Sequence, residues 1–179
     1  IPHYQNQQIL RAIPYDTAML GFENNVTNQL CLWAVEIPVT EEGNYLTLAQ
    51  RREVEDITAV LYPDDSNEAG RLLRLKQEYF FVSAGIQRIH RYFLSLGLPI
   101  TEFPNKVAIH INDTHPALCV PELMRLLLDE DGLSWEMAWD ITVKTLSYTN
   151  HTIMQEALEK WQTTMVEHLL PRIYQIIQE

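Results

Sequence analysis

The sequence predicts an α/β protein, in which strands and helices alternate along 179 residues. Two patterns predict this fold class. An apolar run of strand length at residues 107–111 ends directly in polar side chains, and apolar residues recur with helical spacing over residues 72–93. Apolar side chains make up 46% of the chain, which is enough for a sizeable core in one domain. We therefore expect residues 1–179 to form a segment of one α/β domain, with helices flanking a sheet.

Two strands are expected at the amino end of the chain. Residues 8–14 are predicted to form a short strand, and residues 15–17 are expected to lead into a loop that contains Gly21. Residues 24–38 alternate apolar and polar side chains, which predicts a half-buried strand that ends before Pro38. The next predicted elements are a polar, acidic connector at residues 40–44, a short helix within residues 45–55 and a strand at residues 57–61.

The longest predicted helix begins near residue 70 and runs to about residue 96. Its apolar residues recur at spacings of three and four, which places them on one stripe: Leu72, Leu75, Tyr79, Val82, Ile86, Ile89 and Phe93. We expect this stripe to face the core rather than a ligand. Gly97 and Pro99 then end the helix, as glycine and proline commonly do after a C-cap.

Polar side chains follow the apolar strand at residues 107–111. Ligands of open α/β sheets bind beyond the carboxyl ends of the strands, so the position of residues 112–115 suggests a functional site. Residues two apart on a strand face the same side, so Asp113 and His115 should point together if the chain stays extended to Pro116. The alternative is a structural turn, because Asn, Asp, Thr and Pro are all common in turns.

The remaining elements are predicted from helical spacing and from start and stop signals. Pro121 fits the first turn of one helix, Ser134 is placed to cap another, and Pro171 should interrupt the last helical pattern. The predicted elements are helices at residues 121–129 and 135–146, a short strand within residues 147–152, a helix from residue 155, and a broken helix at residues 163–179.

Composition excludes several classes of partner. The formal net charge of -11 repels nucleic acid and anionic membrane surfaces, while a neutral polyol such as a sugar remains compatible.

Cys31 and Cys119 lack metal-ligand spacing, so we expect reduced, buried thiols in a cytoplasmic protein. The chain begins at Ile1 without an initiator methionine and stops within an apolar pattern at Glu179, so we expect a segment of a longer protein.

Candidate chemistry falls in three segments, which hold Asp64 and Asp65 with Arg74, Asp113 with His115, and Tyr148 with Asn150 and His151. Asp113 and His115 are possible ligands for a divalent metal, but His151 or Asp65 would have to complete the site from elsewhere. A sugar-binding subsite fits this mixture of hydrogen-bonding and aromatic side chains better. Taken alone, His151 also fits a partly buried histidine with a purely structural role.

Several short sequences in the chain are shared, in the same order, with one enzyme family. They are PYDT at 14–17, LYPDD at 61–65, GRLLRLKQEYF at 70–80, INDTHPAL at 111–118, PELMRLL at 121–127, SYTNHT at 147–152, EALEKW at 156–161 and LLPR at 169–172. Together they resemble the glycogen and maltodextrin phosphorylases, and the resemblance covers nearly the whole chain.

The resemblance implies a parent several times longer, with a two-domain GT-B glycosyltransferase architecture of Rossmann-like sheets. Residues 1–179 would be the later part of its amino-terminal domain. The family uses inorganic phosphate to release glucose 1-phosphate from an α-1,4-glucan, and its pyridoxal phosphate is held by a carboxyl-terminal domain without counterpart here. The parent would be a cytoplasmic homodimer, and the segment alone is expected to be inactive. The alternative is a stand-alone α-glucan-binding module without catalysis.

The resemblance also implies roles for particular residues. His151 matches the residue that contacts the glucosyl unit undergoing transfer, and it is the catalytic candidate. Asp65 and Ser66 match the gate loop, where the family commonly has Asn in place of Ser66. The substrate-binding candidates are Asp65, Ser66, Arg74, Asp113, His115, Tyr148, Asn150, Thr152 and Ala157. We expect no metal, no cofactor bound to this segment, and as partners the glucan, phosphate and the rest of the phosphorylase chain.

Overall fold

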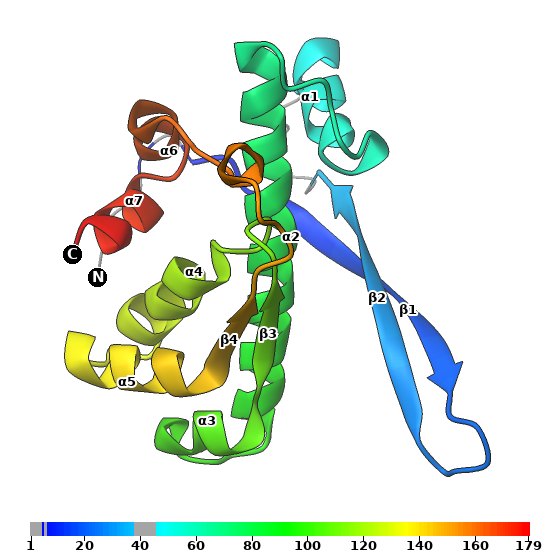
Figure 1. The fold of residues 1–179 in the computed structure, drawn as a ribbon, viewed down its shortest axis with the longest axis vertical. Coiled ribbons are helices and arrows are strands. Elements are labelled where there is room, and N and C mark those ends of the chain that lie inside the picture. Colours follow the sequence, from blue (N-terminus) through cyan, green and yellow to red (C-terminus); the bar gives the residue numbers. More distant parts are fainter. Residues whose placement is uncertain (1–4, 6, 38–45) are drawn as a thin grey trace. The chain divides into compact units, whose positions relative to one another are not determined.

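The computed structural model describes residues 5, 7–37 and 46–179. This part of the chain is a mixed α/β protein with small sheets and flanking helices (Figure 1), which confirms the predicted class. It divides into two compact units, which we call the amino-terminal unit, up to Gln77, and the carboxyl-terminal unit, residues 78–179. The predicted connector at residues 40–44 lies outside the described residues.

An antiparallel hairpin opens the amino-terminal unit. β1 (Arg11–Leu20) pairs along its whole length with β2 (Thr27–Glu36), so that Tyr15 lies opposite Leu32. The strand predicted at residues 24–38 is confirmed. The predicted loop that contains Gly21 is confirmed, but the predicted strand end at Pro14 is wrong. Pairing with β2 holds Tyr15, Asp16 and Thr17 in the extended ladder despite the low strand preference of Asp.

α1 (Leu48–Ala59) follows and confirms the short helix predicted within residues 45–55. It begins with a capping box, in which the Thr47 side chain accepts from the Gln50 N–H and the Gln50 side chain accepts from the Thr47 N–H. The strand predicted at residues 57–61 is wrong. Ile57 lies one helical turn beyond Val54 in α1, and both are buried. The prediction failed because a short apolar run fits one face of a helix as well as a strand.

α2 (Glu68–Ser95) is the predicted long helix, and its stripe buries Leu75, Val82, Ile86 and Phe93. Gly97 follows it with a φ of 66°, the left-handed conformation that favours glycine, which confirms the predicted stop. At the start of the helix, a Cβ on Gly70 would lie 1.8 Å from the carbonyl oxygen of Asp64. Glycine is therefore required for the loop to turn back onto α2.

The carboxyl-terminal unit is built on a pair of parallel strands, β3 (Ile109–Asn112) and β4 (Leu146–Thr149), which lie side by side (Figure 1). Both were predicted, although the first begins two residues later because residues 103–106 form the short helix α3 (Phe103–Lys106). The strands are paired in register, with Ile109 opposite Leu146 and Asn112 opposite Thr149.

The helices around this pair follow the prediction closely. Ser134 caps α5 by accepting from the N–H of Met137 at 3.3 Å, and Pro171 separates the last two helices. The predicted helix from Gln155 is wrong, because only one 3-10 turn forms there. The remaining elements are η1 (Ile100–Glu102), α4 (Cys119–Arg125), the π-helical η2 (Leu126–Glu130), α5 (Trp135–Thr145), η3 (Gln155–Ala157), α6 (Thr163–Leu169) and α7 (Pro171–Gln178).

The core of the carboxyl-terminal unit lies between α2, α3, β3 and helices α4, α5 and α7. The rings of Phe93 and Phe103 meet edge to face with centroids 5.0 Å apart. Cys119 is buried, as predicted, whereas Cys31 on β2 is only half-buried, and the two cysteines form no disulfide. Burial, followed by the charge of Glu122, raises the pKa of Cys119 to about 11.

Glu122 joins α4 to α2 although no part of it is exposed. Its carboxylate accepts from Arg125 at 2.8 and 2.9 Å, from the Ser83 hydroxyl at 2.7 Å and from the Tyr79 hydroxyl at 3.1 Å. Burial and then the charge of Glu122 raise the pKa of Tyr79, so its hydroxyl stays protonated and donates. Burial disfavours the charged form of Arg125, but the Glu122 carboxylate raises the pKa of Arg125 overall.

Candidate functional site

The two sides of the β3–β4 pair have different chemistry. Ile109 and Ile111 lie on the side that joins the core, together with Leu146. The other side is exposed and carries His110, Asn112, Ser147 and Thr149, as strand alternation requires. The ring of His110 is tied across the pair, with Nδ1 2.9 Å from the Ser147 Oγ and Nε2 2.7 Å from the Thr149 Oγ1.

His151 continues this polar side beyond the carboxyl end of β4. It follows Thr149 by two residues, and its Nε2 lies 2.7 Å from the Oδ1 of Asn112 on β3. The backbone around it is closed by Asn150, whose side chain donates to the Thr152 carbonyl at 2.8 Å and accepts from the Thr152 N–H at 3.1 Å. Such side-chain bonds to nearby backbone compete with helix formation, which explains why the chain does not start a helix directly after this loop.

Asp113 takes the alternative that the sequence left open, a turn. Its φ is 63°, in the left-handed region, and its Oδ1 accepts from the N–H of Thr114 at 2.9 Å. Its own N–H donates to the carbonyl of Thr149 at 2.8 Å, one step beyond the last strand pair. The expectation that Asp113 and His115 share one side of an extended strand is therefore wrong, because the chain leaves the strand at Asp113.

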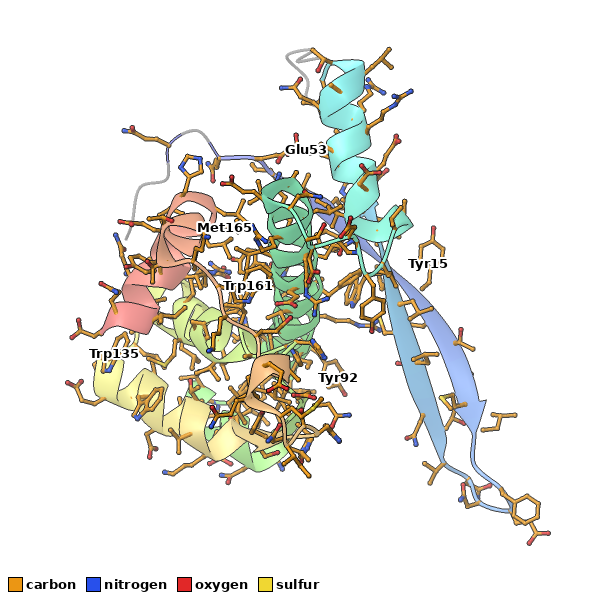
Figure 2. All side chains as sticks on the ribbon, turned by 45° about the horizontal axis from the view of Figure 1, so that its top comes forward. Tyr15, Glu53, Tyr92, Trp135, Trp161 and Met165 are labelled. Atoms are coloured by element: carbon orange, nitrogen blue, oxygen red, sulfur yellow. The ribbon has the colours of Figure 1, made fainter. Side chains whose placement is uncertain are left out.

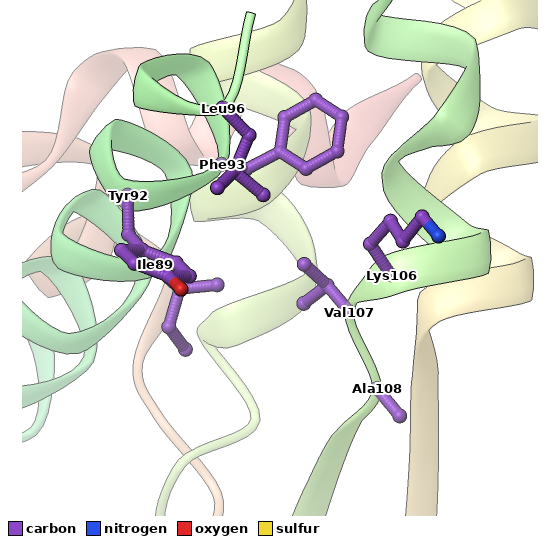
Figure 3. Close-up of a pocket in the computed structure, with 7 residues that line it drawn as sticks. All are labelled: Ile89, Tyr92, Phe93, Leu96, Lys106, Val107 and Ala108. Carbon is purple, nitrogen blue, oxygen red and sulfur yellow. The ribbon is translucent and has the colours of Figure 1, made fainter. Parts of the chain in front are cut away.

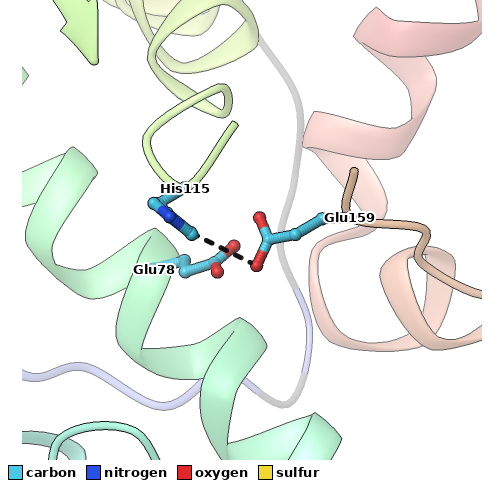
Figure 4. A group of neighbouring side chains, drawn as sticks. All are labelled: Glu78, His115 and Glu159. Carbon is cyan, nitrogen blue, oxygen red and sulfur yellow. Dashed lines mark ion pairs between the residues drawn. The ribbon is translucent and has the colours of Figure 1, made fainter. Parts of the chain in front are cut away.

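His115 instead meets two carboxylates from distant segments. Its Nδ1 lies 3.6 Å from the Oε1 of Glu159, and Glu78 of α2 points toward the same place (Figure 4). One ligand atom from each of the three lies within 4.8 Å of the others, a donor set of the kind that holds divalent cations. This set differs from the one considered from the sequence, which joined His115 to Asp113 and to His151 or Asp65.

The other predicted residues after β4 are placed differently from His151. Tyr148 lies opposite Ile111 on the core side of the strand pair and is half exposed, so it does not join His151 on the polar side. Thr152 is partly buried and closes the Asn150 loop, while its Oγ1 accepts from the N–H of Met154 at 3.3 Å. Ala157 is exposed on η3.

Asp65, Ser66 and Arg74 belong to the amino-terminal unit, where the first two form a loop shaped by its own hydrogen bonds. The N–H of Ser66 donates to the Oδ1 of Asp64 at 3.0 Å, and this bond, followed by one from the Ser66 side chain, lowers the pKa of Asp64. Arg71 donates to the carbonyl oxygens of Asp65 at 3.2 Å and Ser66 at 3.5 Å. Arg74 lies on α2, one turn beyond Arg71.

One pocket of the carboxyl-terminal unit is lined by none of the residues predicted to bind the substrate. It has a volume of about 260 Å³ and is bounded by α2 and the segment that leads into β3 (Figure 3). Its walls are mainly apolar, and the charge is supplied by Lys106. The lining residues are Ile89, Tyr92, Phe93, Leu96, Lys106, Val107 and Ala108.

Sequence reasoning missed Asn112 as a partner of His151. Its signal was present, because a residue at the end of one parallel strand lies beside the residues that leave the end of the next. Glu78 and Glu159 were missed as partners of His115, and for them the sequence offered no signal. They come from segments 37 and 44 residues away from His115, and only tertiary packing brings them together.

None of the helices in the described part of the chain combines the length and apolar character needed to cross a bilayer.

Comparison with known proteins gives a consistent result along the whole chain. The family model for carbohydrate phosphorylase matches residues 1–179. Glycogen phosphorylase of Bacillus subtilis (strain 168) is 48% identical, over 99% of this chain and 22% of its own length. Glycogen phosphorylase 2 of Dictyostelium discoideum is 48% identical, over 98% of this chain and 18% of its own length. The Homo sapiens muscle form of glycogen phosphorylase is 46% identical, over 96% of this chain and 22% of its own length. The chain thus spans about a fifth of the length of these curated relatives.

Proposed function

The chain belongs to the carbohydrate phosphorylase family, and from this premise we propose that it supplies the glucan side of the active site of an α-1,4-glucan phosphorylase. The full-length relatives carry the name of that enzyme, glycogen phosphorylase. The proposed reaction uses inorganic phosphate to cleave the terminal α-1,4 bond and releases glucose 1-phosphate. A stand-alone glucan-binding module is not favoured by these relatives.

The observation that carries the proposal is the position of His151 at the end of the β3–β4 pair, in a chain of this family. His151 lies beyond the carboxyl end of β4, the edge at which ligands of α/β sheets bind, and it is exposed while its Nε2 is held by Asn112. Its Nδ1 has no hydrogen-bond partner among the described residues, so it is available to a sugar hydroxyl. A ring fixed in this way can orient the glucosyl unit for reaction.

The roles proposed for the other residues differ with their surroundings. Asp113 and Asn150 shape the two turns at the ends of β3 and β4, and Thr152 closes the second turn. His115 lies with Glu78 and Glu159 in a charged group beside the first turn. We assign Asp65, Ser66 and Arg74 to a loop and helix start that help admit the glucan, together with Ala157 and Tyr148 as lining of the glucan path.

We assign pyridoxal phosphate to another part of the full-length enzyme, as the resemblance to the family implies, and three of the four lysines described here do not fit it. Lys76 pairs with Glu53, and Lys144 pairs with Asp140 at 2.6 Å. Lys106 stands beside the apolar pocket, whose lining provides no second cation for a phosphate group. The part played by these residues is therefore to bind and orient sugar.

The proposed parent is a cytoplasmic homodimer with a GT-B architecture of two Rossmann-like domains, of which this chain would supply part of the first. The β3–β4 pair, with helices packed against one side, agrees with a piece of such a sheet. In the parent, the rest of the chain would cover apolar surfaces that these residues expose. The exposed hairpin side chains of Tyr15 and Leu32 are examples.

An assay of phosphorolysis tests this proposal. We expect the full-length protein, loaded with pyridoxal phosphate, to release glucose 1-phosphate from maltoheptaose in the presence of phosphate. The 179-residue chain should release none under the same conditions. The proposal fails if the loaded full-length protein is inactive on maltoheptaose and on glycogen, or if it releases free glucose in place of the phosphate ester.

A further inference from the structure

The hydrogen bond between Asn112 and His151 joins two neighbouring strand ends. Asn112 is the last residue of β3 and lies in register with Thr149, the last residue of β4. His151 follows two residues later on the same side, and its Nε2 lies 2.7 Å from the Oδ1 of Asn112. The bond thus spans the same two strands as the backbone ladder, and the ladder fixes the separation of the two residues.

We propose that Asn112 is a positioning residue that sets the tautomer and the ring orientation of His151 for binding the reacting sugar. The inference rests on the proposed function and adds to it a residue with no role so far. The Oδ1 of Asn112 can only accept, so the neutral ring carries its hydrogen on Nε2. Nδ1 then presents a lone pair, which accepts a hydrogen bond from a sugar hydroxyl.

The surroundings of Asn112 hold it in place for this role. The N–H of the next residue, Asp113, donates to the Thr149 carbonyl at 2.8 Å and so extends the ladder past Asn112. The neighbouring polar pair on the same side is already occupied, because both ring nitrogens of His110 contact Ser147 and Thr149. His110 therefore has no ring nitrogen left to bond His151. Among the described residues, Asn112 is the side-chain partner of His151.

Two substitutions in the full-length enzyme test the role. Asn112→Leu keeps the size of the side chain but removes the acceptor, and we expect it to lower kcat/KM for maltoheptaose by about tenfold, as loss of a partner of a functional histidine does elsewhere. Asn112→Asp keeps an acceptor toward Nε2–H and should retain most of the activity. Ser147→Ala serves as the matched control, because it removes a bond to His110 on the same side of the strand pair.

A double-mutant cycle separates positioning from a structural effect. If Asn112 acts through His151, Asn112→Leu should have no further effect in a His151→Ala background, and the melting temperatures of both variants should stay near that of the wild type. Nitrogen-15 spectra of the wild-type histidine rings should show His151 protonated on Nε2. If the Leu variant does not fold, Asn112→Ala replaces it in the cycle.

Several results would overturn the inference. They are wild-type activity in a folded Asn112→Leu variant, additive losses in the cycle, a hydrogen found on Nδ1 of His151, or failure of both the Leu and Ala variants to fold. An active wild-type enzyme with any of these results rejects only the role of Asn112. An inactive wild-type enzyme rejects the proposed function and this inference with it.

Discussion

Asp113 turns the chain out of β3 by adopting a φ of 63°, a conformation that Asp and Asn tolerate better than most residues. The polar run after the strand is therefore both a turn and a candidate site, and the two interpretations do not compete. The turn moves His115 away from the line of the strand toward Glu78 and Glu159. At the same time Asp113 stays bonded to the backbone of β4 beside His151.

Two substitutions at this turn and loop should affect turnover more than stability in the full-length enzyme. His151 is exposed, and Asn occupies the left-handed conformation at position 113 as readily as Asp. We expect His151→Ala to lower kcat/KM by roughly 100-fold, the scale on which lost orienting hydrogen bonds act. Asp113→Asn should have a smaller effect on kcat/KM, because an amide oxygen can still accept from the Thr114 N–H. Steady-state kinetics and thermal melting measure the two effects. Equal relative losses of turnover and of melting temperature would indicate a structural role instead.

Cys119 should react with alkylating agents only at strongly alkaline pH. Burial raises its pKa to about 11, so at pH 8 almost all of the thiol is protonated and unreactive. The raised pKa also makes the folded state retain a proton that the unfolded state loses, so this contribution to stability disappears as the pH rises from about 9 to 11. Iodoacetamide labelling followed by mass spectrometry gives the rate.

Cys31 provides the internal comparison, because it is only half-buried. Rapid labelling of Cys119 at pH 8, at a rate like that of Cys31, would contradict the burial of α4 against the core.

The helices are held together by a mixture of apolar packing and one buried polar network. Glu122 of α4 accepts hydrogen bonds from two side chains of α2, so the two helices are joined by more than contact area. The periodicity of the apolar stripe correctly predicted α2. It gave no indication of Glu122, because a buried acid leaves no mark in a hydrophobic pattern unless its partners are known.

Glu122→Ala should lower the free energy of unfolding by about 3–5 kcal/mol, because it removes the buried acceptor of two hydroxyl groups and of Arg125, which keeps the exposed partner Glu130. Lys144→Ala is the matched control, since it breaks an exposed pair with Asp140 and should cost less than about 0.5 kcal/mol. Urea unfolding measures both. The double change Glu122→Leu with Arg125→Met should recover most of the loss. A loss below about 1 kcal/mol for Glu122→Ala would contradict this network.

Short elements were the ones that sequence patterns misjudged. The apolar run at residues 57–61 fits a strand and a helix face equally. It overlaps the end of α1, where Val54 and Ile57 are both buried on one side of the helix. The segment from Gln155 has helical spacing but forms a single turn. Its preceding loop is already closed by Asn150 and Thr152 through side-chain bonds to the backbone.

At the scale of the whole molecule, the hairpin exposes a group of large apolar side chains. Tyr15 projects from β1 (Figure 2), and it shares one side of the hairpin with Leu32, Leu30 and Met19. Between 48% and 62% of each of these side chains is exposed. Contiguous apolar side chains on an open sheet are a common cause of association.

We therefore expect the 179-residue chain to self-associate when it is expressed alone. Replacing Tyr15 and Leu32 by Lys should shift the chain toward monomer, because charge on this side of the hairpin prevents its burial against a second copy. Gln29→Lys, on the opposite side of the same hairpin, should have little effect. Sedimentation velocity measures the distribution. A monodisperse monomer of the unmodified chain would contradict the expectation.

The sequence by itself determined the α/β class, the long helix, the strands at residues 107–111 and within 147–152, and the family, because each depends on periodicity or on short motifs along the chain. It also placed Asp113 at a strand end and His151 in the polar segment that holds the next strand. Only the tertiary structure decided the partners of the histidines, which are Asn112 for His151, and Glu78 and Glu159 for His115. It also placed Tyr148 on the core side of the β3–β4 pair, away from the polar side. The physical reason is that a hydrogen bond or ion pair depends on a distance of a few ångströms between atoms, which strand register and helix packing set and sequence separation does not.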